Sequence, residues 1–129
     1  VTLVSLLQEA GIEVYADVGD CDRPDIAGYT SSDPSNGTIM VVVCTENLRE
    51  VHENEPIIRQ QINFTIDHEG LHAAQFCLGE GYPGPIEPIW DNETEALWYE
   101  GKTQAVGQQV IRFCFWCTIL QKRSSHFAF

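Results

Sequence analysis

Two histidines, His68 and His72, stand four positions apart, and a glutamate, Glu69, directly follows the first of them. On a helix, residues i and i+4 project from one face with Cβ atoms about 5–6 Å apart. Two imidazoles placed in this way can share one tetrahedral zinc ion at a Zn–N distance of about 2.0–2.1 Å. Glu69 lies about 100° round the helix from His68. It can therefore flank the ion and hold a water molecule there without being a ligand.

A hydrolytic zinc site also needs a third protein ligand and an open position for water. His-Glu-x-x-His on a helix is the spacing of zinc peptidases, which makes the search for that ligand worthwhile. After His72 the chain has one further histidine, His126, close to the C-terminus. Carboxylates are better placed, because residues 91–100 contain four of them. These are Asp91, Glu93, Glu95 and Glu100.

Glu93 and Glu95 are the two candidates for the third ligand. They lie about 200° apart on a helix, so both cannot face one ion. Glu93 shares its face with Ala96, whose small side chain lets two helices approach closely, whereas Glu95 shares its face with Trp98. We prefer Glu93 and keep Glu95 as the alternative ligand. A solvated acidic helix start, which suits the helix dipole, would explain both carboxylates without a metal.

The periodicity of the chain predicts the helices that would carry these residues. Isoleucines at positions 58, 62 and 66 recur every four residues, which predicts one long helix over residues 57–78. Residues 79–88 hold three glycines and three prolines and must form a loop. A second long helix is expected from residue 90 or 91 to about residue 120, with Gly101 and Gly107 as points of interruption.

The N-terminal part carries the strand patterns. Residues 12–17 alternate as a half-buried strand, and a short strand is expected near residues 28–30. Residues 33–37 read Asp-Pro-Ser-Asn-Gly and have the chemistry of a turn. The β-branched run at residues 38–44 predicts the strongest strand of the chain. We expect it to be an edge strand, beside which a peptide substrate would lie extended.

The remaining segments complete an α+β prediction. Residues 2–10 have helical spacing that ends at Gly11, and residues 45–56 are polar and read as a loop that could contain one helical turn. The whole predicts a small mixed sheet packed on an active-site helix and on a second, ligand-bearing helix. We expect one domain over residues 1–129, with the metal-site core at about residues 38–100 and a C-terminal tail at about residues 121–129.

Charge and hydropathy exclude two classes of partner. The net charge is −12, from 19 acidic and 7 basic residues. Nucleic-acid binding needs clustered Lys and Arg, so nucleic acid is not expected as a partner. The longest apolar run, residues 38–44, is far too short to cross a bilayer, so no membrane span is expected. The first residues show no basic region and no cleavage site, so no signal peptide is expected.

Five cysteines leave the redox state open. An odd count prevents full pairing within one chain. In an oxidising environment one or two disulfides are expected, for example among Cys21, Cys44 and Cys77, whereas in a reducing one all five would be small core residues. Cys114 and Cys117 have the spacing of a redox motif or of half a zinc site. The chain lacks a second close pair, which favours a structural role or a local disulfide.

The chain resembles the zincin-like metallopeptidases, specifically gluzincins, in which a His-Glu-x-x-His helix is followed by a helix bearing a ligand glutamate. The resemblance rests on residues 68–72 and on Glu93-Thr94-Glu95-Ala96, which matches the Glu-x-x-Ala pattern of several such families. It covers residues 38–100. It implies a minimal zincin-like fold and a peptide or protein substrate hydrolysed with Glu69 as general base. It also implies Zn²⁺ as the cofactor, with three ligands: His68, His72 and Glu93.

A second resemblance is to small uncharacterised zincin-like proteins of cyanobacteria and their phages. It rests on the order "GIEVYAD", a cysteine, "GYT", "TIMVVVC" and "TIDHEGLHAAQFC". It suggests an alternative function, a non-catalytic binding module or virion structural or assembly module that keeps zinc for structure. An extracellular or virion-associated location and an oligomeric or virion assembly would follow. Tyr82, Tyr99 and His126 are the candidates for an oxyanion stabiliser, and none stands out, which is why the alternative stays open.

Overall fold

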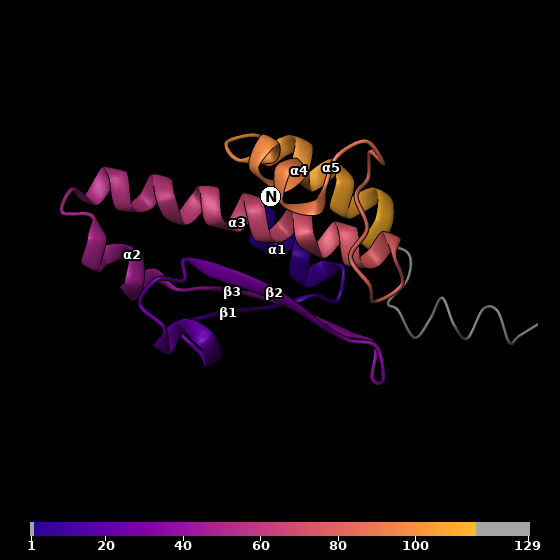
Figure 1. Ribbon diagram of the computed structural model, residues 1–129, viewed down its shortest axis with the longest axis horizontal. Helices are drawn as coiled ribbons and strands as arrows, with labels where there is room; N and C mark the ends of the chain where they lie inside the picture. The colour runs from indigo at the N-terminus through magenta and orange to yellow at the C-terminus, as the bar shows by residue number, and fades with distance from the viewer. Residues whose placement is uncertain (1, 116–129) are drawn as a thin grey trace, which may run out of the picture.

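The computed structural model describes residues 2–115 and confirms the predicted α+β class, with helices packed on a small mixed sheet (Figure 1). In chain order the elements are α1 (Leu3–Glu9), β1 (Glu13–Ala16), the short 3₁₀ helix η1 (Gly19–Asp22), β2 (Gly28–Asp33), β3 (Thr38–Val43), α2 (Thr45–Val51), α3 (Glu55–Leu78), α4 (Asn92–Tyr99) and α5 (Thr103–Cys114). Within these residues, no helix has both the length and the apolar character needed to span a membrane.

The sheet has the strand order β1-β3-β2, which corrects one prediction. β1 pairs with β3 in parallel and β2 pairs with β3 antiparallel, so β3 is the central strand. The expectation that residues 38–44 form an edge strand is therefore wrong. Val41 and Val42 of this central strand are both fully buried. The edge strand beside the helices is β2, which joins β3 through the predicted turn, where the Gly37 N–H donates to the Asp33 carbonyl at 2.9 Å.

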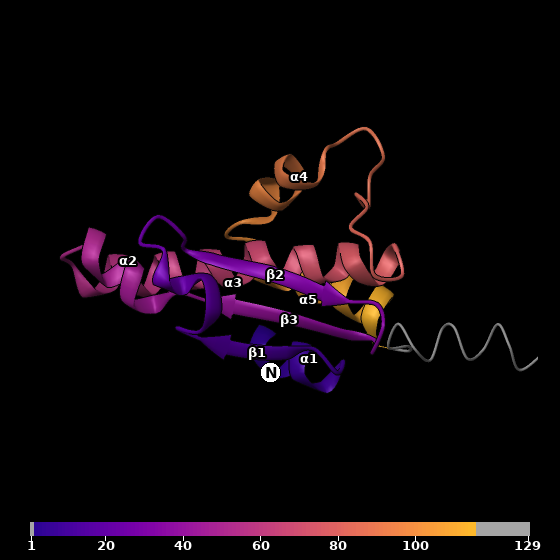
Figure 2. The same cartoon turned by 60° about the horizontal axis from the view of Figure 1, so that its bottom comes forward.

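The core lies between the sheet and the helices α1, α3 and α5. Helix α3 runs along one face of the sheet, and α5 packs against α3 (Figures 1 and 2). The core residues come from all these elements: Leu7, Val41, Leu71, Ala74, Val106 and Val110. Gly70 allows the close approach of the two helices, since a Cβ there would stand 3.3 Å from Val106 Cγ1. Helix α3 is thus held firmly at the turn that follows His68.

Helix α3 confirms the predicted helix at residues 57–78, and it begins slightly earlier, at Glu55. Its N-cap is Asn54, whose side chain accepts a hydrogen bond from the N–H of Ile57 at 3.4 Å. Pro56 stands in the first turn, where a missing N–H leaves no helical hydrogen bond unmade. The 24 residues of α3 extend from α2 past the whole sheet, so one rigid element carries the complete His-Glu-x-x-His pattern.

The predicted second helix is two helices, α4 and α5. The chain turns sharply after Tyr99, because Gly101 adopts a positive φ of 81° that other residues rarely adopt. Gly107 lies inside α5 and does not interrupt it. There it provides close packing, since a Cβ would stand 3.2 Å from Leu6 Cδ1. The predicted end of this helix near residue 120 lies outside the described residues, as do Cys117, His126 and the predicted tail.

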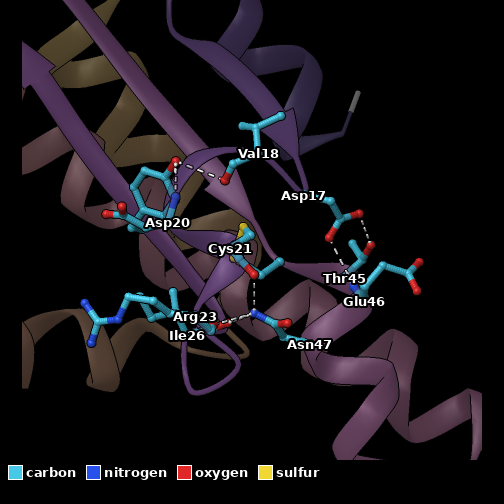
Figure 3. Close-up of a disulfide and its surroundings, with 11 residues drawn as sticks. Asp17, Val18, Asp20, Cys21, Arg23, Ile26, Thr45, Glu46 and Asn47 are labelled. Carbon is cyan, nitrogen blue, oxygen red and sulfur yellow. Dashed lines mark hydrogen bonds between the residues drawn. A yellow bond between two sulfur atoms is a disulfide. The ribbon is translucent and has the colours of Figure 1, made fainter.

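Helix α2 corrects the prediction of a loop over residues 45–56. Its first turn is capped by a carboxylate distant in sequence, Asp17 at the end of β1 (Figure 3). The Thr45 hydroxyl donates to Asp17 Oδ2 at 2.6 Å, and the Glu46 N–H donates to Oδ1 at 3.1 Å. The sequence alone indicated no more than one helical turn in this polar segment, because the cap comes from a residue far away in the chain.

Two disulfides join elements that are distant in the sequence. Cys21–Cys44 ties η1 to the end of β3, and Cys77–Cys114 ties α3 to the end of α5. The predicted pairing among the first three cysteines is thus confirmed for one pair, whereas Cys77 pairs with Cys114 instead. Beside the first disulfide, Asn47 Nδ2 reaches the carbonyl oxygens of Cys21, Arg23 and Ile26 at 2.9–3.0 Å (Figure 3). These contacts hold the segment that leads into β2.

Candidate metal centre

Three of the predicted site residues meet in one group that could hold a metal ion. His68 and His72 project from α3, and Glu93 reaches them from the first turn of α4. One ligand atom from each lies within 4.8 Å of the others. Glu93 Oε1 stands 2.5 Å from His72 Nε2, and Glu93 Oε2 stands 3.3 Å from His68 Nε2. The i, i+4 spacing on α3 thus places both imidazoles on one side of the helix, and the Glu93 carboxylate lies opposite them.

The position of Glu93 depends on how α4 begins. Asp91 is the N-cap of α4, and its side chain accepts a hydrogen bond from the Thr94 N–H at 2.7 Å. The Glu93 side chain is 69% exposed, whereas those of His68 and His72 are 15% and 13% exposed. Helix α4 and the loop before it project beyond α3 and β2 (Figure 2). The carboxylate thus approaches the histidines from the open side of the site.

Glu95, the alternative ligand, faces away from this group. It is buried, and its carboxylate accepts hydrogen bonds from Gln75 Nε2 at 2.9 Å, from the Ile86 N–H at 2.7 Å and from the Glu87 N–H at 2.8 Å. These bonds tie the loop between α3 and α4 to both helices. The structure thus gives the two glutamates separate places, Glu93 beside the histidines and Glu95 beneath the loop.

The Nδ1 atom of each imidazole lies beside a hydrogen-bond acceptor, whereas the Nε2 atom of each ring faces Glu93. His68 Nδ1 lies 2.8 Å from Glu100 Oε2, and His72 Nδ1 lies 2.7 Å from Gln75 Oε1. When Nδ1 donates its proton, Nε2 keeps the lone pair that a metal needs, and such outer partners also fix the ring orientation. Sequence reasoning offered Glu100 only as one of four acidic residues of its segment.

Glu69 lies beside the two histidines in a mostly buried position. Thr30, on β2, donates its hydroxyl to Glu69 Oε1 at 2.8 Å and also lies 2.9 Å from the Glu69 carbonyl oxygen. Burial raises the pKa of the Glu69 carboxyl above its usual range, and the Thr30 hydrogen bond and the nearby imidazoles offset this only in part. Such a shift moves a carboxyl toward the range in which a general base works. Sequence reasoning did not find Thr30.

The group opens into a cleft of about 750 Å³ between α3, β2 and α4. One wall is the segment that leads into β2 and the start of that strand, residues 25–30. Gly28 is what lets this wall lie against α3. A Cβ at Gly28 would stand 2.6 Å from Thr65 Cγ2 and 2.7 Å from the Val42 carbonyl oxygen. The predicted wall, residues 38–44, lies one strand further away.

The cleft offers few groups that could stabilise a developing negative charge on a substrate. Its lining, as far as the chain is described, contains no Lys or Arg. Tyr29 lines it, but its hydroxyl donates to the Val18 carbonyl oxygen at 3.2 Å. Of the predicted oxyanion stabilisers, Tyr82 is exposed on the loop and Tyr99 packs against the core; neither lines the cleft. His126 lies outside the described residues.

Comparison with known proteins adds no relative. No protein-family model matches the chain, and neither a curated protein nor a solved structure matches it. The resemblance to gluzincins therefore stays a prediction from the sequence motifs, and the argument for a metal centre stands on the geometry of the site.

Proposed function

We propose that the protein is a zinc-dependent metallopeptidase of the gluzincin type. The observation that carries this proposal is the meeting of His68, His72 and Glu93 in one group at a cleft, with the Glu69 carboxylate beside it. In this proposal the two histidines and Glu93 are the metal ligands. Glu69 is the group for proton transfer.

The donor set fits zinc. Two imidazole nitrogens and one carboxylate oxygen are a ligand set of catalytic zinc sites, which keep a fourth position for water. Magnesium and calcium prefer sites made of oxygen ligands. Each histidine also has the Nδ1 partner that zinc-binding imidazoles usually have. When bound, zinc would lower the pKa of a water ligand to about 7 and polarise the substrate carbonyl.

Glu69 would perform the proton transfers of peptide hydrolysis. The Thr30 hydroxyl holds Oε1, so Oε2 is the oxygen available to the water. Glu69 takes a proton from the water while the water oxygen attacks the carbonyl carbon of the peptide. It then gives that proton to the nitrogen of the leaving amine as the C–N bond breaks. The raised pKa of Glu69 suits a group that must both accept and release a proton.

The free edge of β2 supports a peptide as the substrate. The Cys44 N–H donates to the Ala27 carbonyl and the Asp17 N–H donates to the Val43 carbonyl. In an antiparallel pair these bonds alternate along the strand, so Tyr29 and Ser31 bond to β3. Gly28 and Thr30 then direct their N–H and C=O groups outward, beside Glu69. An extended peptide could add to this edge as a further strand.

Comparing the native protein with Glu69→Gln tests the proposal. We expect about one zinc per chain in both, because Glu69 is not a ligand. Cleavage of a mixed peptide library should fall about 10²- to 10⁴-fold in the variant, the usual contribution of a general base. Glu50→Gln, at an exposed position on α2, should cleave like the native protein. Zinc-free native protein, or a native protein as inert as Glu69→Gln, would overturn the proposal.

The alternative function is a non-catalytic, zinc-stabilised binding module or virion structural or assembly module. Two observations favour it. The described lining of the cleft lacks a free Tyr, Lys or Arg to stabilise an oxyanion, and two disulfides suit an oxidising environment such as the outside of a cell or a virion. Under this alternative, zinc would raise the unfolding temperature of native protein and of Glu69→Gln equally, and neither would cleave any peptide.

A further inference from the structure

Gln75 connects the candidate metal centre to the interior of the protein. It stands one helical turn after His72 and is completely buried. Its Oε1 lies 2.7 Å from His72 Nδ1. Its Nε2 donates to Glu95 Oε1 at 2.9 Å and to the Asn92 carbonyl oxygen at 3.2 Å. A continuous hydrogen-bonded path thus runs from His72 through Gln75 to Glu95.

Glu95 decides which way round the Gln75 amide lies. Besides Gln75, it receives the backbone N–H groups of Ile86 and Glu87, so every group that faces it is a donor. A backbone carbonyl oxygen can only accept a hydrogen bond, and that of Asn92 lies 3.2 Å from the same end of the Gln75 amide. The Gln75 NH₂ group must therefore point to Glu95 and to the second acceptor, the Asn92 carbonyl. A flipped amide would set its oxygen against both of them.

The orientation of Gln75 decides the tautomer of His72 in turn. With the amide nitrogen committed, only the carbonyl oxygen of Gln75 faces the ring, and that oxygen can only accept. His72 must then carry a proton on Nδ1. In the neutral ring this leaves the Nε2 lone pair pointing toward Glu93 and His68, where an ion would lie.

We propose that Glu95 and Gln75 are positioning residues that hold His72 in its Nδ1–H tautomer, with Nε2 ready to bind the ion. The inference rests on the metal site of the proposed function, but it concerns this buried path and not the peptidase reaction. It also gives Glu95 a role that the sequence could not assign, since it acts on the site through Gln75 and not as a ligand.

Zinc affinity, measured by competition with a chromophoric chelator, tests the path. Gln75→Met keeps the volume of the buried side chain and leaves the two backbone bonds of Glu95 in place. We expect it to weaken zinc binding about 10- to 100-fold, as for other outer-shell changes, and Glu95→Gln to do the same. Because both residues act through one path, the zinc affinity of the double variant should be little lower than that of the single variant that binds zinc less tightly. The matched control is Glu87→Gln, an exposed glutamate of the same loop, which should bind zinc like the native protein.

A second measurement is independent of metal. Nitrogen-15 NMR of the histidine rings, on metal-free protein at a pH where the rings are neutral, reports which nitrogen carries the proton. We expect His72 of the native protein to be protonated on Nδ1, even though the Glu93 carboxylate competes for a proton on Nε2. Gln75→Met should shift the ring toward the Nε2–H form.

The outcomes separate this inference from the proposed function. A native His72 protonated on Nε2, or losses of zinc affinity that add fully in the double variant, would overturn the inference. Protein that binds no zinc but keeps His72 in the Nδ1–H form would overturn the proposed function and leave the tautomer assignment standing. If Glu95→Gln does not fold, Gln75→Met decides alone, by the ring signal and by zinc affinity.

Discussion

At the residue scale, the two histidines of the site differ in what holds them. The Nδ1 of His68 meets a carboxylate, Glu100, whereas that of His72 meets an amide, Gln75. A carboxylate partner makes an imidazole a more basic ligand than an amide does. We therefore expect Glu100 to contribute both orientation and charge at His68, and Gln75 to contribute mainly orientation at His72.

Replacing Glu100 should weaken the metal site without touching a ligand. We expect Glu100→Ala to lower zinc affinity about 10- to 100-fold, because His68 loses the group that fixes its ring. Glu100→Gln should lower zinc affinity less, since an amide oxygen can still accept a hydrogen bond from Nδ1–H. Chelator competition measures both. Glu53→Ala, at an exposed position after α2, serves as control. Unchanged affinity in Glu100→Ala would show that this contact does not support the site.

Gly28 tests whether the cleft depends on the close approach of β2 to α3. A Cβ at this position would meet Thr65 Cγ2 at 2.6 Å and the Val42 carbonyl oxygen at 2.7 Å, and a backbone atom cannot move aside cheaply. We expect Gly28→Ala to lower the free energy of unfolding in urea by about 1–3 kcal/mol, the usual effect of overpacking. Gly84→Ala is the control, because no atom lies within 4 Å of a Cβ there. Equal stability of the two variants would contradict this reading of the β2–α3 contact.

How far the sequence could predict the site depends on how many residues separate the side chains that contact one another in it. His68, Glu69 and His72 belong to one helical turn, so their spacing alone placed them together. Thr30 and Glu100 lie 39 and 32 residues from their partners in the site. Nothing in a single sequence marks a threonine or one of several glutamates for such a contact, because it exists only once β2 and the α4–α5 turn have packed on α3.

At the element scale, the errors share one physical cause, which is that the deciding contact is tertiary. The break between α4 and α5 is fixed by the Gly101 N–H, which donates to the buried carboxylate of Asp67 at 3.0 Å. The same turn brings the neighbouring residue, Glu100, to His68. A helix pattern that runs through residues 90–120 could not show this, whereas the strongly periodic α3 needed no such contact to be predicted.

Helix α2 offers a pH-dependent test of a distant cap. Burial would raise the pKa of Asp17, but hydrogen bonds from the Thr45 hydroxyl and from the Glu46 N–H outweigh it and hold that pKa below its usual value. A carboxylate with a depressed pKa in the folded state stabilises the fold above its unfolded pKa of about 3.9. That contribution is lost as the pH falls through the folded-state pKa.

We therefore expect Asp17→Asn to remove part of the acid dependence of stability. Asn tolerates the positive φ of 59° at this position, so the change isolates the charge. Urea unfolding midpoints of native and variant protein should differ most near neutral pH and converge below the pKa of Asp17. Asp22→Asn, at an exposed position on η1, should run parallel to the native protein at every pH. If the urea midpoints of native protein and Asp17→Asn differed by the same amount at all pH values, this role for the charge would be contradicted.

At the scale of the whole molecule, disulfides hold two of the three parts that border the cleft. Cys21–Cys44 fastens the segment that becomes the β2 wall, and Cys77–Cys114 fastens α3 to α5. Neither disulfide involves α4 or the loop before it, and there Glu95 supplies hydrogen bonds instead. The candidate metal ligands thus come from one helix that a disulfide braces and from one helix held by hydrogen bonds.

This arrangement predicts that the disulfides and the metal share the stabilisation of the fold. The two disulfides span sequence separations of 23 and 37 residues, for which loop-closure entropy gives about 3–4 kcal/mol each. Together they approach the whole stability of a typical domain, about 5–15 kcal/mol. Zinc at one hundred times its dissociation constant would add about 2.7 kcal/mol. We expect each pair of Cys→Ala changes alone to leave a folded protein with a lower urea midpoint.

Removing all four described cysteines should then leave a chain that is largely unfolded without metal and that zinc partly refolds. Circular dichroism during a zinc titration would measure this, because most of the described structure is helical. The same titration on a variant that also carries His72→Ala is the control, and it should show no refolding, since the ion would lack a ligand from α3. A four-cysteine variant as stable as the native protein would contradict the role given to the disulfides. Refolding that persists after His72→Ala would show that zinc acts elsewhere on the chain.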